Sequence, residues 1–231
     1  MGGLRWSEFG LGGFVVQGVL IDWGGVLTTG LAEAIDEWIA ADRIDGSRYR
    51  DVMRELIRHA YEGAVDGENT VHALERGEIS AAEFERDLAA RLLTLDGVPP
   101  IAEGLLTRMF AGFRPVESMH EMLRHARAAG LKTCLLSNSW ANDYPRDTWT
   151  DLFDQVVISG EVGMRKPEPR IFHHALDLIA LPPAQCVFID DIEANITAAQ
   201  SLGIHGLHHT TPTTTITHLE TLTGVPLRAG S

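Results

Sequence analysis

The chain has 231 residues, of which 32 are acidic and 19 are basic, so its formal net charge is −13. A surface this acidic argues against nucleic acid and against an anionic membrane as partners, and no apolar run reaches the roughly 20 residues that span a bilayer. The length suits one large domain, or a core domain with an inserted subdomain.

The start of the chain and its two cysteines indicate the compartment. Residues 1–14 are rich in glycine and lack the basic region, apolar core and cleavage site of a signal peptide, so we expect a frayed extension. Cys134 and Cys186 each lie in an apolar run that is typical of a strand. Buried, reduced thiols are therefore expected rather than a disulfide, which favours a cytoplasmic protein.

The first predicted strand ends at a carboxylate. The apolar run 15–21 is followed by Asp22, and then at once by Trp23, Gly24 and Gly25. A strand that delivers one carboxylate into a Gly-rich turn exposes a nucleophile and does not pack a core. Gly24 stands two residues after the aspartate, where a second carboxylate would serve as general acid and base.

The next eighty or so residues have the periodicity of amphipathic helices. We expect five of these helices, at residues 31–42, 47–62, 68–75, 80–93 and 101–111. Ser80 and Glu83 have the spacing of a capping box at the start of the fourth. The stretch 31–111 is therefore predicted to be an all-helical insert.

Beyond the insert, helices alternate with strands. We expect helices at 116–129, 168–179 and 192–202, strands at 131–136, 156–158, 186–190 and 204–207, a polar loop at 137–150, and a Thr-rich stretch at 210–217 that caps a final helix near 216–222. This alternation predicts an α/β fold with a doubly wound parallel sheet. The predicted core is residues 1–30 and 112–231, and residues 31–111 form a helical cap.

Polar residues stand at the ends of three of these strands, and a lysine lies in a stiff loop before a helix. They are Asp22, Ser137, Asn138, Asp190, Asp191 and Lys166. Ligands of open parallel sheets gather beyond the carboxyl ends of the strands. Three neighbouring carboxylates need a cation, and their oxygens suit Mg²⁺. Together with the lysine, they form the electrostatic set that phosphoryl transfer requires.

These segments resemble the four motifs of the haloacid dehalogenase-like hydrolases, in the expected order and over nearly the whole chain. The stretches 163–172 and 188–196, with 76–80 in the insert, look like one helical-capped branch of that superfamily. The branch includes the phosphatase domain of soluble epoxide hydrolases and bacterial sugar-1-phosphate phosphatases. The resemblance implies a Rossmann-like core, Mg²⁺ and a small phosphorylated substrate.

The resemblance also implies a role for each residue. Asp22 would be the nucleophile that forms an aspartyl-phosphate, and it would ligate Mg²⁺ together with the carbonyl of Gly24 and with Asp191. Asp190 would ligate through water or pair with Lys166. Residues that would bind the phosphoryl group are Ser137, the amide of Asn138, Lys166 and the N–H groups of Trp23 and Gly24. The side chain of Trp23 would either pack in the core or form a wall for the substrate.

Gly24 departs from the pattern, since most phosphatases of the superfamily carry Asp there. Such a group typically contributes about 10²–10⁴-fold to the rate. Its absence predicts catalysis that favours good leaving groups, such as anomeric sugar phosphates or aryl phosphates. His59, Glu62 or His72 in the cap could stand in for the missing acid.

Other interpretations stay open at this stage. The protein could bind phosphate and regulate with negligible turnover, or it could transfer the phosphoryl group to an acceptor other than water. Dehalogenation is disfavoured, because the pair Asp190 and Asp191 would serve no purpose there. The same pair could also act only as a helix cap, and Lys166 only as a solvated charge. A homodimer is possible, and the sequence does not identify the substrate.

Overall fold

The computed structural model describes residues 16–61, 69–141 and 143–228, without the side chains of residues 57–61. The predicted extension at residues 1–14 therefore lies outside the described part. Five parallel strands form one sheet in the order β3-β2-β1-β4-β5. They are β1 (Gly18–Ile21), β2 (Lys132–Ser137), β3 (Gln155–Ile158), β4 (Cys186–Asp190) and β5 (His205–His208). The predicted doubly wound α/β fold is confirmed.

The strand register brings the polar strand ends together. Ile21 at the end of β1 pairs with Leu135 of β2 on one side and with Ile189 of β4 on the other. Residues just beyond these pairs therefore meet at the carboxyl edge of the three central strands. The alternation of side chains along β1 divides the core, because Val19 and Ile21 join one apolar cluster and Leu20 joins another.

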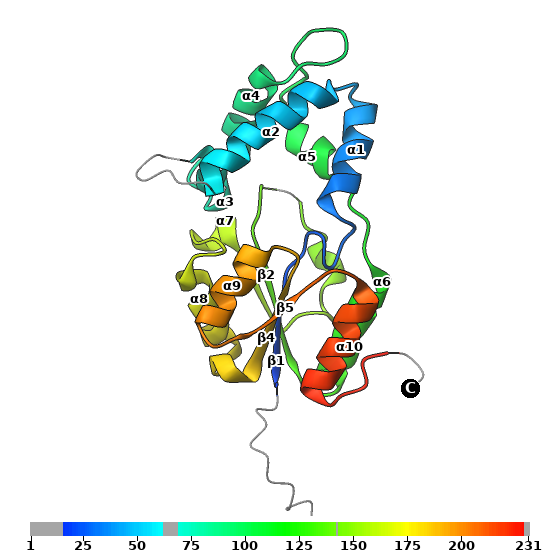
Figure 1. Ribbon diagram of the computed structural model, residues 1–231, viewed down its shortest axis with the longest axis vertical. Coiled ribbons are helices and arrows are strands. Elements are labelled where there is room, and N and C mark those ends of the chain that lie inside the picture. The colour runs from blue at the N-terminus through cyan, green and yellow to red at the C-terminus, as the bar shows by residue number, and fades with distance from the viewer. Residues whose placement is uncertain (1–15, 62–68, 142, 229–231) are drawn as a thin grey trace, which may run out of the picture.

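Helices cover both faces of this sheet (Figure 1). One face carries α6 (Glu117–Ala128) and α10 (Pro212–Thr223), whose Met119, Leu123 and Leu219 are fully buried. The other carries α8 (Pro169–Ile179) and α9 (Glu193–Ser201), with Phe172 of α8 edge-on to Phe188 of β4 at 5.2 Å between ring centroids. Strands that are buried on both sides explain why the predicted runs are apolar without interruption.

Five helices follow β1 and lie above the carboxyl edge of the sheet in Figure 1. They are α1 (Leu31–Ala41), α2 (Gly46–Tyr61), α3 (Thr70–Glu75), α4 (Ala81–Arg91) and α5 (Leu105–Phe110). They have an apolar core of their own, which includes Trp38, Phe84, Leu88 and Met109. The capping box of Ser80 and Glu83 is present at the start of α4. We call α1 to α5 and their connections the cap.

The chain passes between sheet and cap at two adjacent places. Thr28 and Pro115 form an isolated antiparallel bridge. The N–H of Thr29 donates to the carbonyl of Arg114 at 2.8 Å, and the N–H of Val116 donates to that of Leu27 at 2.9 Å. The two crossings are thus joined by backbone hydrogen bonds. The proposed boundaries at residues 30/31 and 111/112 themselves stay a prediction.

Some elements differ from the expectation for identifiable reasons. Helix α5 begins four residues later than predicted, after Gly104, whose φ of 68° is not helical. Helix α10 begins at Pro212, well before residue 216, because Thr211 accepts a hydrogen bond from the N–H of Thr214 and a proline suits the first helical turn. A short helix, α7 (Ser159–Val162), was not predicted.

Two further observations concern the cysteines and membranes. Cys134 and Cys186 are both buried and carry free thiols, as expected. In the described part of the chain, no helix has the length and apolar character that crossing a bilayer requires.

Candidate active site

The turn after β1 holds Asp22 at the edge of the sheet. The N–H of Asp22 donates to the carbonyl of Ile189 in β4 at 2.9 Å, which continues the strand ladder by one residue. The turn then requires Gly25, whose φ is 74°. A Cβ atom at this position would lie 2.5 Å from Oδ2 of Asp191. The glycine therefore lets the backbone of the turn approach Asp191 closely.

Lys166 lies between two of the carboxylates. Its Nζ is 2.7 Å from Oδ1 of Asp22 and 2.7 Å from Oδ2 of Asp190, and the residue is only 1% exposed. Burial acts to lower the pKa of Lys166, but Asp190 and Asp22 outweigh it and hold the pKa above its usual value. The ammonium therefore stays protonated at neutral pH.

Asn138 fixes the backbone on which Lys166 stands. Its Nδ2 donates to the carbonyl of Lys166 at 3.0 Å, and its Oδ1 accepts from the N–H of the same residue at 2.8 Å. Both ends of the amide are thus used on one peptide segment. The side chain thus braces the lysine loop, and the main-chain amide of Asn138 is the group proposed to contact phosphate.

The acidic residues form a compact cluster. Ligand atoms of Asp22, Asp190 and Asp191 lie within 4.8 Å of one another, and the structure describes no other group of three or more His, Cys, Asp or Glu in this arrangement. Asp190 is oriented by Asn195, whose Nδ2 is 3.1 Å from each carboxylate oxygen, and by the N–H of Ile192 at 2.8 Å.

The electrostatics of the cluster fit a divalent cation. Burial raises the pKa of Asp22 to about 7; Lys166 opposes this effect and Asp190 adds to it. One ammonium thus faces three carboxylates, which leaves excess negative charge at hard oxygen atoms. Mg²⁺ prefers oxygen ligands of this kind and binds through one or two carboxylates with water. The residues present therefore fit the ion that the sequence predicts.

Ser137 is the last residue of β2, and Trp23 lies in the turn after β1. Oγ of Ser137 is 2.9 Å from the hydroxyl of Tyr144. Trp23 is 6% exposed, and its ring lies 5.1 Å from that of Trp149 and 5.9 Å from that of Tyr144. It also lines the cavity above the site. Both interpretations of Trp23 thus agree with its position, since it packs in the core and also lines the cavity.

A cavity of about 490 Å³ opens above these residues. Seven predicted site residues line it: Asp22, Trp23, Gly24, Ser137, Asn138, Lys166 and Asp191. Asp190 is the one predicted site residue that does not line it, and it is fully buried. The structure thus brings the eight residues predicted for the floor of the site, Asp190 included, to one place.

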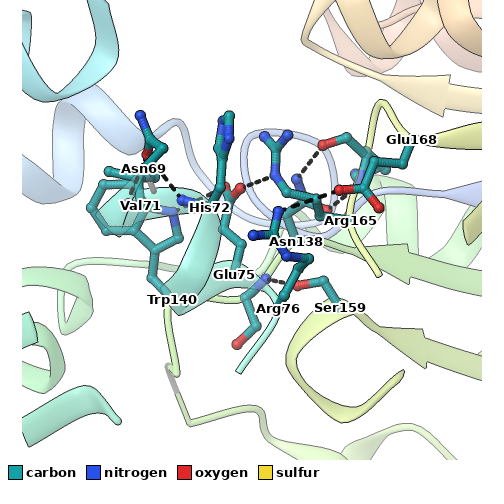
Figure 2. Close-up of polar contacts among 12 residues, drawn as sticks. Asn69, Val71, His72, Glu75, Arg76, Asn138, Trp140, Ser159, Arg165 and Glu168 are labelled. Carbon is teal, nitrogen blue, oxygen red and sulfur yellow. Dashed lines mark hydrogen bonds and ion pairs between the residues drawn. The ribbon is translucent and has the colours of Figure 1, made fainter. Parts of the chain in front are cut away.

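The cap is attached to the edge of the site by a buried ion pair (Figure 2). Glu75 of α3 pairs with Nε of Arg165, the residue before Lys166, and its other oxygen accepts from Nε1 of Trp140 at 3.2 Å. Glu75 is 5% and Arg165 4% exposed. Sequence reasoning missed this contact. The available signal was a glutamate beside Leu74 and one turn after Val71, on the apolar face of its helix.

The cap offers little support for a substitute acid. His59 and Glu62 lie outside the described side chains. Burial, together with the nearby Arg165 and Arg76, lowers the pKa of His72 to about 4. Its imidazole is therefore neutral at physiological pH, and it does not line the cavity.

Comparisons with known proteins agree with this geometry. The family model described as haloacid dehalogenase-like hydrolase matches residues 16–203. The chain is 32% identical to mouse acyl-CoA dehydrogenase family member 10 over 99% of its own length, but spans only 21% of that protein. It is 30% identical to the sesquiterpene phosphatase astK of Aspergillus oryzae, over 70% of this chain and 83% of that one.

A solved structure shows the same fold. The enzyme BT-2542 of Bacteroides thetaiotaomicron, in complex with magnesium and inorganic phosphate, is similar with a TM-score of 0.57 and 22% identity, over 84% of this chain and 94% of that one. The family model covers most of the chain, and the sequence resemblance pointed to the same superfamily. The chain therefore belongs to the haloacid dehalogenase-like hydrolases.

Proposed function

We propose that the protein is a Mg²⁺-dependent phosphatase that hydrolyses a small organic phosphomonoester through an aspartyl-phosphate. The observation that carries the proposal is the contact of Lys166 with both Asp22 and Asp190, beside Asp191, on the floor of a cavity. A carboxylate nucleophile, a cationic clamp and a metal site are what phosphoryl transfer needs. The relative named a phosphatase and the magnesium and phosphate complex of BT-2542 support it.

Asp22 would be the nucleophile. Its carboxylate would attack the phosphorus atom in line with the ester oxygen, so that a new P–O bond forms while the ester P–O bond breaks and the leaving oxygen takes the electron pair. Water would then attack the phosphorus, releasing phosphate and restoring the carboxylate. Lys166, Ser137 and the main-chain amide of Asn138 would hold the phosphoryl oxygens during both steps.

Asp22, Asp191 and the main-chain carbonyl of Gly24 would hold Mg²⁺, and Asp190 would act through water or through its pair with Lys166. When bound, the ion would supply positive charge to the phosphoryl oxygens.

The presence of Gly24 determines which leaving groups we expect the enzyme to favour. No carboxylate stands at this position to protonate the ester oxygen, and Glu75, another carboxylate of the described cavity lining, is engaged by Arg165 and Trp140. The enzyme would therefore favour esters whose alcohols leave without help, such as aryl phosphates or anomeric sugar phosphates.

The direct test is phosphate release from a panel of aryl, sugar, nucleotide and alkyl phosphates. Turnover of the aryl esters should require Mg²⁺, disappear on chelation and return when the ion is added back. If alkyl esters are hydrolysed as fast as aryl esters, with chemistry limiting the rate, the leaving-group proposal is wrong. Acceleration by added alcohols or sugars would instead reveal phosphotransfer.

Gly24 also favours a rival function, that of a regulatory protein which binds phosphate without turnover. Such a protein would bind phosphate with Mg²⁺ in calorimetry and release none from any ester of the panel. A cytoplasmic location and a homodimer stay predictions.

Replacement of Gly24 by Asp is expected to raise the hydrolysis of poor leaving groups by up to about 10²–10⁴-fold, because it adds the missing acid and base. The site has room, since the nearest atom to a Cβ at position 24 is Cζ of Phe113 at 3.9 Å. The readout is kcat for an alkyl and an aryl phosphate.

Gly24→Asn is the matched control, because asparagine has the same shape as aspartate but no ionisable group to act as acid or base. A gain by the Asn variant equal to that of the Asp variant would contradict the acid-base explanation. No gain in a folded, Mg²⁺-binding Asp variant would mean that another group already supplies the proton.

A further inference from the structure

The cavity above the phosphate site has two chemically different ends. Its floor is polar and consists of the residues described above at the carboxyl ends of β1, β2 and β4. Its roof comes from the cap, whose α1, α2, α3 and α5 lie above that edge in Figure 1. Because the phosphoryl group is held at the floor, whatever is esterified to it must extend toward the roof.

The roof is apolar. It is formed largely by Ile35, Tyr49, Met53, Val71 and Phe110, and Trp140 from the loop after β2 packs against the cap beside them. Val71 is 3%, Ile35 6% and Met53 9% exposed, so these side chains show the cavity only a small part of their surface. The rings of Phe110 and Trp140 meet edge to face at 6.3 Å, and Phe110 stacks on Phe113, which also lines the cavity, at 5.6 Å.

Glu75, Asn138 and Asn195, three polar residues of the described lining, already have partners. The carboxylate of Glu75 is paired with Arg165 and accepts from Trp140. Asn138 uses its amide on the backbone of Lys166, and Asn195 donates to Asp190. On the roof, this leaves the phenol of Tyr49 as the polar side chain for a ligand. A polyhydroxylated leaving group would therefore bury several hydroxyls without partners, which is unfavourable.

We propose that the leaving group of the natural substrate is an apolar phenol, or another apolar alcohol that leaves without being protonated, that fills the cap cavity, and not a sugar. The inference rests on the proposed phosphatase function and narrows its substrate class. A second cavity, of about 620 Å³, shares Trp23, Phe110 and Phe113 with the first.

The test uses phenyl phosphates that carry a 4-alkyl chain of increasing length, since the chain changes apolar area and leaves the reactivity of the phenol nearly constant. With Mg²⁺, kcat/KM should rise about fourfold per added methylene until the cavity is full. A terminal hydroxyl on the chain should remove most of this gain. A flat series, or a preference for glucose 1-phosphate over the alkylphenyl esters, would overturn the inference and leave the phosphatase function intact.

Two variants locate the effect in the cavity. Met53→Gln adds a polar amide of similar shape and should lower kcat/KM for the hexyl ester by about tenfold or more, with less than about threefold change for unsubstituted phenyl phosphate. Met53→Leu keeps the side chain apolar and should preserve the dependence on chain length. An equal loss on both esters in the Gln variant would contradict a role of Met53 in recognising the chain.

A binding measurement separates this inference from the proposed function. If no ester is hydrolysed, the phosphatase proposal fails. Calorimetry with hexylphosphonate and methylphosphonate in the presence of Mg²⁺ then tests whether the cavity binds an apolar ligand. Binding of the hexyl compound at least about tenfold tighter would support an apolar ligand. Equal affinities would overturn it.

Discussion

Replacement of Asp22 by Asn is expected to lower kcat by about 10⁴-fold or more, since the loss of a covalent nucleophile removes the reaction path that the rest of the site serves. The change keeps the shape of the side chain and removes its negative charge. Lys166 keeps its second contact, with Asp190 at 2.7 Å, so the loop should stay in place. The measurement is single-turnover and steady-state phosphate release from an aryl phosphate with saturating Mg²⁺.

Asp177→Asn is the matched control, because Asp177 lies exposed on α8 and does not line the cavity. This variant should retain the activity of the unmodified protein. Equal activity of the two variants, with both folded by circular dichroism, would show that hydrolysis occurs elsewhere or without this carboxylate. A labelled phosphoryl group on the peptide that contains residue 22, trapped by acid quench, would support the covalent path independently.

The second large effect concerns stability. Glu75→Gln is expected to lower the free energy of unfolding by about 3–5 kcal/mol, because it leaves the guanidinium of Arg165 buried without a counter-charge. Arg165 is 4% exposed, and within the described residues its Nη2 has no hydrogen-bond partner even with Glu75 present. The measurement is urea unfolding of the full chain at neutral pH.

Two comparisons make this result specific. Asp96→Asn removes the charge that pairs with Arg43, and the side chains of Arg43 and Asp96 are 62% and 66% exposed. This variant should lower the free energy of unfolding by no more than about 1 kcal/mol. The double variant Glu75→Leu with Arg165→Leu removes both charges and should be more stable than Glu75→Gln alone. A cost for Glu75→Gln as small as that of Asp96→Asn would mean that water reaches Arg165.

The proximity of the floor residues could be predicted from the sequence for a physical reason. Asp22, Ser137 and Asp190 each end a buried strand, and the carboxyl ends of parallel strands must share an edge. The positions of these residues along the chain therefore fixed their proximity before any side chain was placed. Lys166 has a different signal, since it lies in a stiff loop that precedes a helix.

The roof of the site and its attachment could not be predicted in this way. Periodicity identifies the buried face of a helix but does not identify the element that this face packs against. The sequence therefore does not predict that Met53 and Val71 lie above the phosphate site. The pair of Glu75 with Arg165 joins residues 90 positions apart. Tyr144, beside Ser137, lies in the stretch 137–150, for which the sequence predicts only a polar loop.

The backbone bridge between Thr28 and Pro115 bears on how the sheet assembles. Strands β1 and β2 are neighbours in the sheet but are separated in sequence by the whole cap, which makes their pairing entropically costly in an unstructured chain. The cap has its own apolar core, and its two ends lie next to each other. Once the helices of the cap have packed, the cap acts as a short connection between its two ends. The entropic cost of bringing β1 and β2 together is then lower.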